Sequence, residues 1–268
     1  MRIIIHDSYE ALSKWTAYYI TTRIKEFNPS PDRPFVLAIP AGLSPIGTFQ
    51  QLISLHQEGK VSFRNVAAFG LNEYAGIPED HPQSHHSVHW NNFFSQIDIQ
   101  ADNVRLLDGN ASDFDRECQN FEDDIKKVGG IHMFLGSIGP DGHIGFNEPG
   151  SSLSSRTRIK TITHGARAAN ARWFGNDINK VPKTGLTMGV GTLMDAEEVL
   201  MVISGFNKAR ALQKILEEEV NHMWTVSMLQ LHQHGIIVCD EEATMELKVG
   251  TVKYFKDIEK DNLGLPEL

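Results

Sequence analysis

Cysteine is scarce in this chain of 268 residues, with only Cys118 and Cys239 present. Two cysteines so far apart in sequence exclude a disulfide framework and fit a reducing compartment. Long apolar runs are also missing, and the opening run Met1 to Ile5 is too short for a secretion signal and indicates a first strand. The sequence therefore predicts a soluble, cytoplasmic protein that does not span a membrane.

An excess of positive charge is absent as well. Lysine and arginine together number 25 against 34 aspartates and glutamates, which gives a net charge of -9 at neutral pH. The basic residues are scattered, so no nucleic-acid surface is predicted. An anionic ligand would need local cations to overcome the overall negative field.

Seven short apolar runs alternate with segments long enough to be helices. They are Ile3–Ile5, Phe35–Ile39, Val66–Phe69, Val104–Leu107, Ile131–Leu135, Val199–Ile203 and Ile236–Cys239. This alternation predicts an α/β protein with a parallel sheet covered on both faces. Residues Tyr9–Phe27 carry apolar side chains at helical spacing. Since no linker or repeat interrupts the pattern, we expect residues 1–268 to form one domain.

The stretch Gly139–Pro149, GPDGHIGFNEP, follows one of these runs. Ligands of parallel sheets bind beyond the carboxyl ends of the strands. Asp141 and His143 would point the same way from an extended backbone, whereas Glu148 could reach the imidazole only through a turn that the glycines permit. A histidine oriented by carboxylates is a general acid/base near neutral pH. A surface turn with a solvated histidine and a metal site are alternative interpretations of the same residues.

A second candidate site lies where the strand Phe35–Ile39 runs into a turn of small residues. We expect the following helix to use Ser44 as its N-cap and Pro45 as its first residue. Backbone N–H groups around Gly42 and Ser44 would then suit an anion, although a capped helix without a ligand explains the turn equally well. Lys208 follows the strand Val199–Ile203 and is placed to meet a phosphate.

Hydroxyl groups and cations gather in residues 151–161, SSLSSRTRIKT. Such a cluster suits phosphate recognition through charge-assisted hydrogen bonds, and a solvated basic strand edge is the alternative. Arg172 lies in the segment ANARWF, where an isolated arginine is commonly solvated.

Four histidines, His81, His85, His86 and His89, fall close together in the chain. His85 and His89 have the spacing that places two side chains on one helix face. Neither a cysteine nor an H-E-x-x-H arrangement accompanies them, so we favour a surface or interface role over metal binding.

Taken in order, these motifs resemble the glucosamine-6-phosphate deaminase family, within the glucosamine/galactosamine-6-phosphate isomerase and 6-phosphogluconolactonase superfamily. The resemblance extends from Met1 to about Phe255. It is carried by GPDGHI and FNEP within residues 139–149, SSRTR at 154–158, VGTLMD at 190–195, VNHMWT at 220–225 and MELKV at 245–249.

The resemblance implies a modified doubly wound, Rossmann-like sheet and a conversion of glucosamine 6-phosphate to fructose 6-phosphate and ammonia in amino-sugar catabolism. No metal or cofactor is implied. A homohexamer activated by N-acetylglucosamine 6-phosphate is usual in the family. His143 would handle the ring-oxygen proton, with Asp141 and Glu148 as relay and orienting carboxylates. The implied substrate-phosphate residues are Gly42, Ser44, Arg172 and Lys208, and the implied allosteric residues, at a site between subunits, are Ser151, Arg158, Lys160, Thr161 and Tyr254.

One departure from the family pattern concerns the base that moves the C2 proton. Members of the family typically read Asn-Met-Asp-Glu-Tyr where this chain has Gly70-Leu71-Asn72-Glu73-Tyr74. An amide accepts no proton, and losing a positioned base typically lowers the rate about 10²–10⁴-fold. Neighbouring positions depart as well: Ala41 replaces a usual threonine, Leu43 a glycine or serine, His85 a tyrosine and Ser137 a glycine.

Three functions are compatible with this pattern. In the first, the chain is a slowed deaminase in which Asn72 positions the substrate and either water or Glu73 acts as the base. The second is a related hexose-phosphate isomerase or lactonase that needs His143 but no C2 base. The third is a catalytically silent, sugar-phosphate-binding regulatory paralogue.

Overall fold

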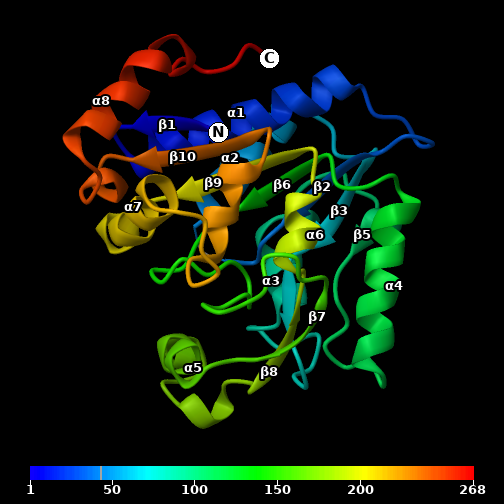
Figure 1. The fold of residues 1–268 in the computed structure, drawn as a ribbon. Helices are drawn as coiled ribbons and strands as arrows, with labels where there is room; N and C mark the ends of the chain where they lie inside the picture. The colour runs from blue at the N-terminus through cyan, green and yellow to red at the C-terminus, as the bar shows by residue number, and fades with distance from the viewer. Residues whose placement is uncertain (43) are drawn as a thin grey trace.

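The computed structural model describes residues 1–42 and 44–268. Seven parallel strands form its main sheet in the order β1-β10-β9-β6-β2-β3-β5 (Figure 1). Their bounds are β1 Arg2–His6, β2 Phe35–Ile39, β3 Val66–Gly70, β5 Val104–Arg105, β6 Met133–Gly136, β9 Glu198–Ile203 and β10 Gly235–Asp240. Every predicted run is confirmed as a strand of this sheet, although β5 ends two residues before the predicted Leu107.

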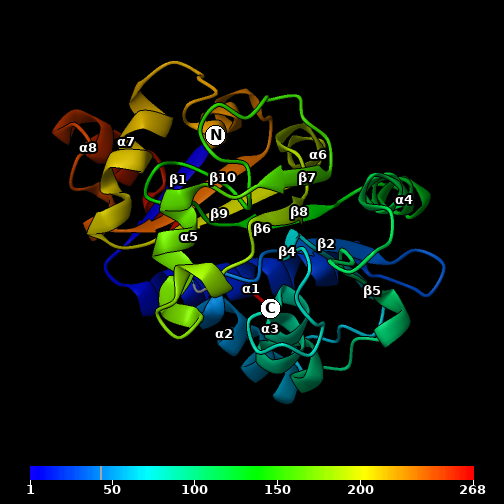
Figure 2. The same cartoon turned by 90° about the horizontal axis from the view of Figure 1, so that it is seen from below.

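Helices cover both faces of the sheet, as predicted (Figure 2). The helices are α1 Tyr9–Phe27, α2 Ile46–Gln57, α3 His85–Asn92, α4 Phe114–Lys127, α5 His164–Asn170, α6 Val190–Met194, α7 Ala209–Glu217 and α8 Val249–Ile258. Side chains of α1 and α2 build one buried core, and those of α4 and α7 build the other. None of the described helices has the length and apolar character needed to cross a membrane.

The helix predicted over Tyr9–Phe27 is confirmed as α1 with the same bounds. Ser8 begins it by accepting a hydrogen bond from the backbone N–H of Ala11, and Asn28 ends it in the left-handed conformation. Leu12, Trp15, Ile20 and Ile24 are fully buried against the sheet. Burial of this stripe is the main source of the stability of the helix.

A second sheet of three short antiparallel strands was not predicted. Its strands are β4 Asn72–Tyr74, β7 Arg158–Thr161 and β8 Thr184–Thr187, in the order β4-β8-β7. Asn72 and Arg158 both pair with Thr187, from opposite sides of β8. This sheet and α5 stand apart from the main sheet (Figure 1).

The direction of strand addition reverses between β2 and β6. From β2 the chain adds β3 and β5 on one side, and from β6 it adds β9 and β10 on the other. Leu37 pairs with Met133 and Ala38 with Phe134, so the two strands leave the sheet side by side. A parallel sheet binds its ligands beyond the carboxyl ends of such a pair. We therefore expect the ligand site in the segments after Ile39 and Gly136.

Candidate active site

The loop after β6 holds an aspartate and a histidine in contact. His143 Nδ1 lies 2.5 Å from the Asp141 carboxylate, which also accepts the His143 backbone N–H. The pKa of Asp141 is lowered chiefly by this hydrogen bond from the imidazole. A carboxylate on Nδ1 fixes the tautomer, so Nε2 is the ring nitrogen left to exchange a proton.

Glycines permit this arrangement. A Cβ on Gly139 would lie 2.0 Å from Cε1 of His143, so only glycine lets the imidazole fold back over the backbone. Gly142 adopts φ +75° and Gly145 φ +57°, a region that other residues enter at a cost. The Gly142 carbonyl accepts a hydrogen bond from Thr225, which ties the loop to the segment after α7.

Lys208 reaches the same loop from β9. Its ammonium group donates to the carbonyl of Ile138, three residues before Asp141. Burial lowers the pKa of Lys208 to about 8, and the nearby Asp141 opposes that shift. The turn before Lys208 is held by Asp240, whose buried carboxylate accepts the backbone N–H of Gly205 at 3.0 Å. A cation and the Asp141–His143 pair therefore lie together beyond the main sheet.

The turn after β2 begins its helix later than predicted. Helix α2 starts at Ile46 with Pro45 as N-cap, so the prediction that Ser44 caps the helix was wrong. The hydroxyl of Tyr9 takes over part of that role, because it accepts the backbone N–H of Gly47 and donates to the carbonyl of Ser44, both at 2.9 Å. Nothing in the sequence indicated this contact.

The same turn is open at Gly42. Apart from its chain neighbours, no described residue has an atom within 4 Å of a Cβ built on Gly42, which leaves room for an anion beside the backbone. Leu43, noted above as a departure from the family pattern, lies outside the described residues.

Glu148 lies elsewhere than the resemblance implied. Its carboxylate accepts the backbone N–H and the hydroxyl of Thr163, at 3.2 and 3.0 Å. Thr163 is the N-cap of α5, so Glu148 links the loop to that helix. Of the two flanking carboxylates, only Asp141 contacts His143 in the described chain, because the turn from Ile144 to Asn147 carries Glu148 towards α5.

Arg172 lies just beyond α5, in the short helix η3 (Ala171–Trp173). Its exposed guanidinium stacks over the ring of Trp173 at 5.0 Å. Across residues 1–42 and 44–268 it enters no ion pair, so its charge is available to an anion.

The two neighbours Asn72 and Glu73 point to opposite sides of β4, because successive side chains of an extended strand alternate. Asn72 is buried, and its backbone carbonyl accepts a hydrogen bond from Nδ1 of His85 at 2.7 Å. Glu73 accepts three backbone N–H groups, from Tyr74, His85 and His86. These hydrogen bonds engage the Glu73 carboxylate at the start of α3, which counts against Glu73 as the replacement base.

Residues 7–238 match the family model described as glucosamine-6-phosphate isomerases/6-phosphogluconolactonase. The chain belongs to this family.

Relatives named glucosamine-6-phosphate deaminase are similar to it over nearly their whole length. That of Phocaeicola vulgatus is 60% identical over 263 residues, covering 98% of this chain and 100% of the relative. That of Borrelia hermsii is 58% identical over 264 residues, covering 98% and 99%.

Solved structures share the fold. A monomeric glucosamine-6-phosphate deaminase superposes with a TM-score of 0.86 at 39% identity, covering 91% of this chain and 98% of the other. A 6-phosphogluconolactonase from Trypanosoma cruzi superposes with a TM-score of 0.72 at 18% identity, covering 92% and 97%, and shows the fold alone.

The residues that the resemblance implied for an allosteric site divide between two places. Arg158, Lys160 and Thr161 lie on β7, and the Arg158 guanidinium donates to Asn147 at 2.9 Å. Ser151 is buried beside the loop, and no described residue accepts or donates to its hydroxyl. Tyr254 lies on α8, which is far from β7 in both views of the fold (Figures 1 and 2).

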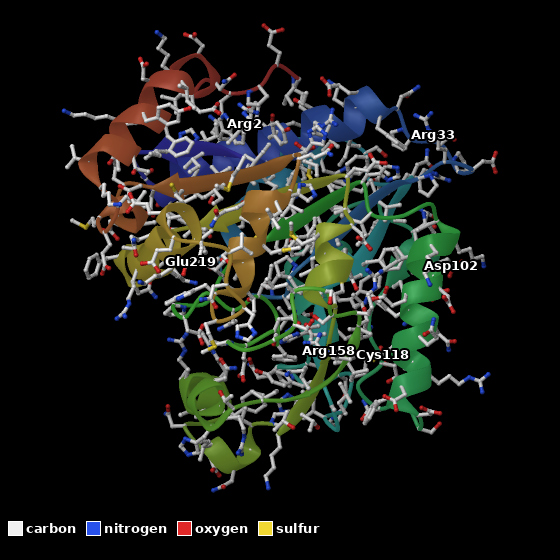
Figure 3. All side chains as sticks on the ribbon, in the orientation of Figure 1. Arg2, Arg33, Asp102, Cys118, Arg158 and Glu219 are labelled. Atoms are coloured by element: carbon white, nitrogen blue, oxygen red, sulfur yellow. The ribbon has the colours of Figure 1, made fainter. Side chains whose placement is uncertain are left out.

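Strand β7 is fastened to α4 by a buried carboxylate. Glu122 of α4 accepts the backbone N–H and the hydroxyl of Thr157 and forms an ion pair with Arg156. Figure 3 shows Cys118 and Arg158 beside each other at this junction. Cys118 and Cys239 are both buried and free.

The histidine run lies in and before α3, and its members differ in their surroundings. His86 pairs with Glu79 at 2.7 Å, and His81 stacks on Phe174. His89 is buried, contrary to the surface or interface role predicted for the run, because α3 packs this face on the sheet. No group of three His, Cys, Asp or Glu side chains could hold a metal ion in the described chain.

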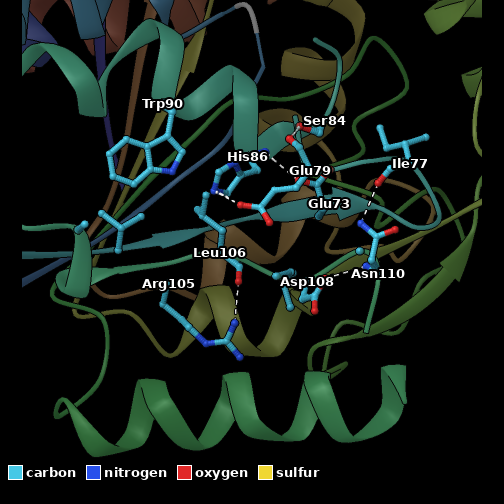
Figure 4. A pocket seen from close by; sticks show the side chains of 14 residues that line it. Glu73, Ile77, Glu79, Ser84, His86, Trp90, Arg105, Leu106, Asp108 and Asn110 are labelled. Carbon is cyan, nitrogen blue, oxygen red and sulfur yellow. Dashed lines mark hydrogen bonds and ion pairs between the residues drawn. The ribbon is translucent and has the colours of Figure 1, made fainter. Parts of the chain in front are cut away.

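A pocket of about 330 Å³ lies on the outer side of α3 and is lined by Glu73, His86, Trp90 and Arg105 among others (Figure 4). Its charged groups are mostly paired with each other or with the chain: His86 with Glu79, and Arg105 with Glu117 and Asp124. The pocket therefore lacks free polar groups comparable to those around His143.

Proposed function

We propose that this chain converts glucosamine 6-phosphate and water into fructose 6-phosphate and ammonia. The names of relatives at 55–60% identity over nearly the whole chain support this reaction. The observation that carries the proposal is the contact between His143 and Asp141 close to the buried Lys208, beyond the strand pair where this fold binds ligands.

The first step opens the sugar ring. The C1 hydroxyl loses a proton, the bond between C1 and the ring oxygen breaks, and the ring oxygen takes a proton. His143 is suited to carry that proton on Nε2, since Asp141 holds Nδ1 and stabilises the imidazolium that forms.

The second step moves hydrogen from C2 to C1. The C2–H bond breaks, its electron pair forms a C1–C2 double bond, and O1 takes a proton. A proton then adds to C1 while the nitrogen electron pair forms a C2–N double bond. Water adds to C2 and ammonia leaves, so C1 is reduced, C2 is oxidised, and the atoms balance.

The phosphate would be held by cations around the loop. Lys208 contacts the loop of the Asp141–His143 pair, the turn at Gly42 and Ser44 offers backbone N–H groups, and Arg172 offers a guanidinium with no ion pair among the described residues. A bound phosphate dianion favours the charged form of Lys208 and so offsets the cost of burying it.

The test is a coupled assay of ammonia and fructose 6-phosphate formed from glucosamine 6-phosphate. The two products should appear in equal amounts. Replacing His143 by Gln should lower kcat about 10²–10⁴-fold, because the ring-opening acid/base is lost. Absence of both products from the unaltered chain under all conditions would overturn the proposal.

A second candidate function is a silent sugar-phosphate-binding regulatory protein, and the observation that favours it is the amide of Asn72 in place of a carboxylate. A lactonase or related hexose-phosphate isomerase that needs no C2 base is favoured by the same amide. Saturable binding of phosphosugar without turnover would select the regulatory protein, and hydrolysis of 6-phosphogluconolactone would select the lactonase.

Regulation by N-acetylglucosamine 6-phosphate in a homohexamer is a further part of the proposal. Ser151, Arg158, Lys160 and Thr161 could meet Tyr254 only from a second copy, given the separation of β7 and α8. Exposed apolar side chains on and before α8, Met245, Val249 and Tyr254, are suited to contact between copies. The reduced cysteines support a cytoplasmic location.

A further inference from the structure

The reaction proposed above requires a base at C2, and the groups first considered for that role are engaged elsewhere. Asn72 has no basic atom, and Glu73 accepts three backbone N–H groups. Asp141 is held by His143, and Glu148 by Thr163. A side chain that accepts the proton in place of water would therefore be another group close to Asn72.

His85 is attached to Asn72 by a hydrogen bond. Its Nδ1 lies 2.7 Å from the Asn72 backbone carbonyl, which is purely an acceptor, so Nδ1 must carry the ring proton. The lone pair is therefore on Nε2. That nitrogen has no hydrogen-bond partner among the described residues, and His85 is only partly buried.

The ring of His85 lies on the side of β4 to which Asn72 points. Tyr74 shares that side, since it is two residues along the strand, and its ring centroid lies 4.9 Å from that of His85. The adjacent His86 points instead into the pocket of Figure 4.

The His143 loop also contacts this ring. Phe146 of that loop stacks on His85 with centroids 5.9 Å apart, and its ring lies 5.4 Å from that of Tyr74, so the three rings form one cluster. The Phe146 backbone N–H donates to Thr187, the residue paired with Asn72 across β4 and β8. His85 therefore contacts both β4 and the loop that carries His143.

We propose that His85 is the catalytic base of this chain, with Nε2 taking the proton from C2 of the open-chain sugar and returning it to C1. This inference rests on the proposed deaminase function. The C2–H electron pair forms the C1–C2 double bond, and the C2 proton resides on the imidazolium until C1 accepts it. No further reactant is required.

The departures at positions 72 and 85 then form a matched pair. The imidazole of His85, which is hydrogen-bonded to residue 72, supplies the lone pair that a carboxylate at position 72 would otherwise supply. The Asn72 backbone carbonyl holds the ring proton on Nδ1 of His85, which leaves Nε2 as the basic nitrogen.

The decisive variant is His85→Asn. The asparagine side-chain amide can donate to the Asn72 carbonyl much as Nδ1–H does, but it has no basic nitrogen. We expect ammonia release to fall about 10²–10⁴-fold, with unchanged affinity for the open-chain alditol form of the substrate, which has no carbonyl to isomerise. The matched control, His86→Asn on the same helix, should keep the activity of the unaltered chain.

Isotopes and rescue separate a base from a positioning residue. In His85→Asn, substrate deuterated at C2 should show a larger kinetic isotope effect than in the unaltered chain, because proton removal becomes rate-limiting. The double variant Asn72→Asp/His85→Asn should regain activity, and the acid limb of its kcat/KM profile should move to lower pH, because a carboxylate then replaces an imidazole as the base. The titratable groups around His85 are Glu73 and Tyr74 on β4 and His86 and His89 on α3.

The outcomes are distinguishable. If the unaltered chain releases ammonia and His85→Asn releases it equally fast, His85 is not the base and the deaminase function stands. If His85→Asn loses its affinity for the alditol as well as its turnover, His85 has a positioning role and the proposal is overturned. Absence of ammonia from the unaltered chain would overturn the function and this inference together. Should His85→Asn fail to fold, His85→Tyr keeps an aromatic ring against Phe146 and Tyr74 and is expected to lose turnover in the same way.

Discussion

At the scale of single residues, the buried ammonium group of Lys208 makes binding depend on pH. Its pKa of about 8 in the folded chain means that the group loses its charge as pH rises through 8. Affinity for a phosphosugar should therefore fall between pH 7 and pH 9. Isothermal titration with the open-chain alditol phosphate at both pH values checks this, and an affinity that does not change would contradict a role of Lys208 in phosphate binding.

The same residue affects the free energy of unfolding. Between the folded pKa of about 8 and the ordinary value of 10.5, the unfolded chain binds more protons, so stability rises with pH in that window. Lys208→Met removes the burial cost and should stabilise the protein by roughly 1–3 kcal/mol at pH 7, with a smaller gain at pH 10. Urea unfolding at both pH values measures this, and an equal gain at both would count against a buried charge.

His89 should make the fold sensitive to acid. Burial, followed by the charges of His85 and His86, lowers the pKa of His89 to about 3. The unfolded histidine titrates near 6.5, so stability is complete above that pH and is lost as pH falls towards 3, by about 2 kcal/mol at pH 5. In His89→Leu the unfolding free energy should fall less between pH 8 and pH 5 than in the unaltered chain. His86→Asn is the control, and a parallel fall in all three proteins would contradict the prediction.

At the scale of elements, Glu73 holds β4 to the start of α3. Its carboxylate accepts the backbone N–H groups of His85 and His86 at 2.9 and 2.7 Å, at the positive end of the helix. Glu73→Gln places an amide N–H against those donors and should lower the unfolding free energy by about 1–3 kcal/mol. Urea unfolding tests this, with the exposed Glu79→Gln as control. Faster hydrogen exchange at the two histidine amides should accompany the loss, and unchanged exchange would be evidence against the contact.

Predictability differed between the two sheets. The parallel strands are continuous apolar runs because both of their faces are buried, and so they were recognised. Strand β4 has three residues, and its partner β8 lies more than 100 residues further along the chain. Polar strands this short carry no periodic signal, and pairing at such a distance depends on the position of the whole β7–β8 unit.

At the scale of the whole molecule, the proposed allosteric site requires two copies of the chain. Because each site would take Lys160 from one copy and Tyr254 from another, Lys160→Ala and Tyr254→Ala should each abolish activation by N-acetylglucosamine 6-phosphate. A mixed oligomer of the two variants should regain part of it, because some sites would then combine an intact Lys160 with an intact Tyr254. Rates measured with the effector, together with sedimentation, test this. A mass of 30.0 kDa at assay concentration would contradict the assembly.

The sequence by itself determined the features that depend on neighbouring residues. The parallel strands follow from buried apolar runs, α1 from its periodicity, and the contact between Asp141 and His143 from a spacing of two residues in a glycine-rich loop. These features are local, so composition and spacing suffice to predict them.

Only the tertiary structure decided which distant groups meet. It placed Lys208 against the carbonyl of Ile138, directed Glu148 to Thr163 and Glu73 to α3, and attached His85 to Asn72. Each of these contacts joins segments whose relative position depends on the order of the strands and the packing of helices between them. Spacing along the chain carries no record of that order, so the free lone pair beside Asn72 became apparent only in the folded protein.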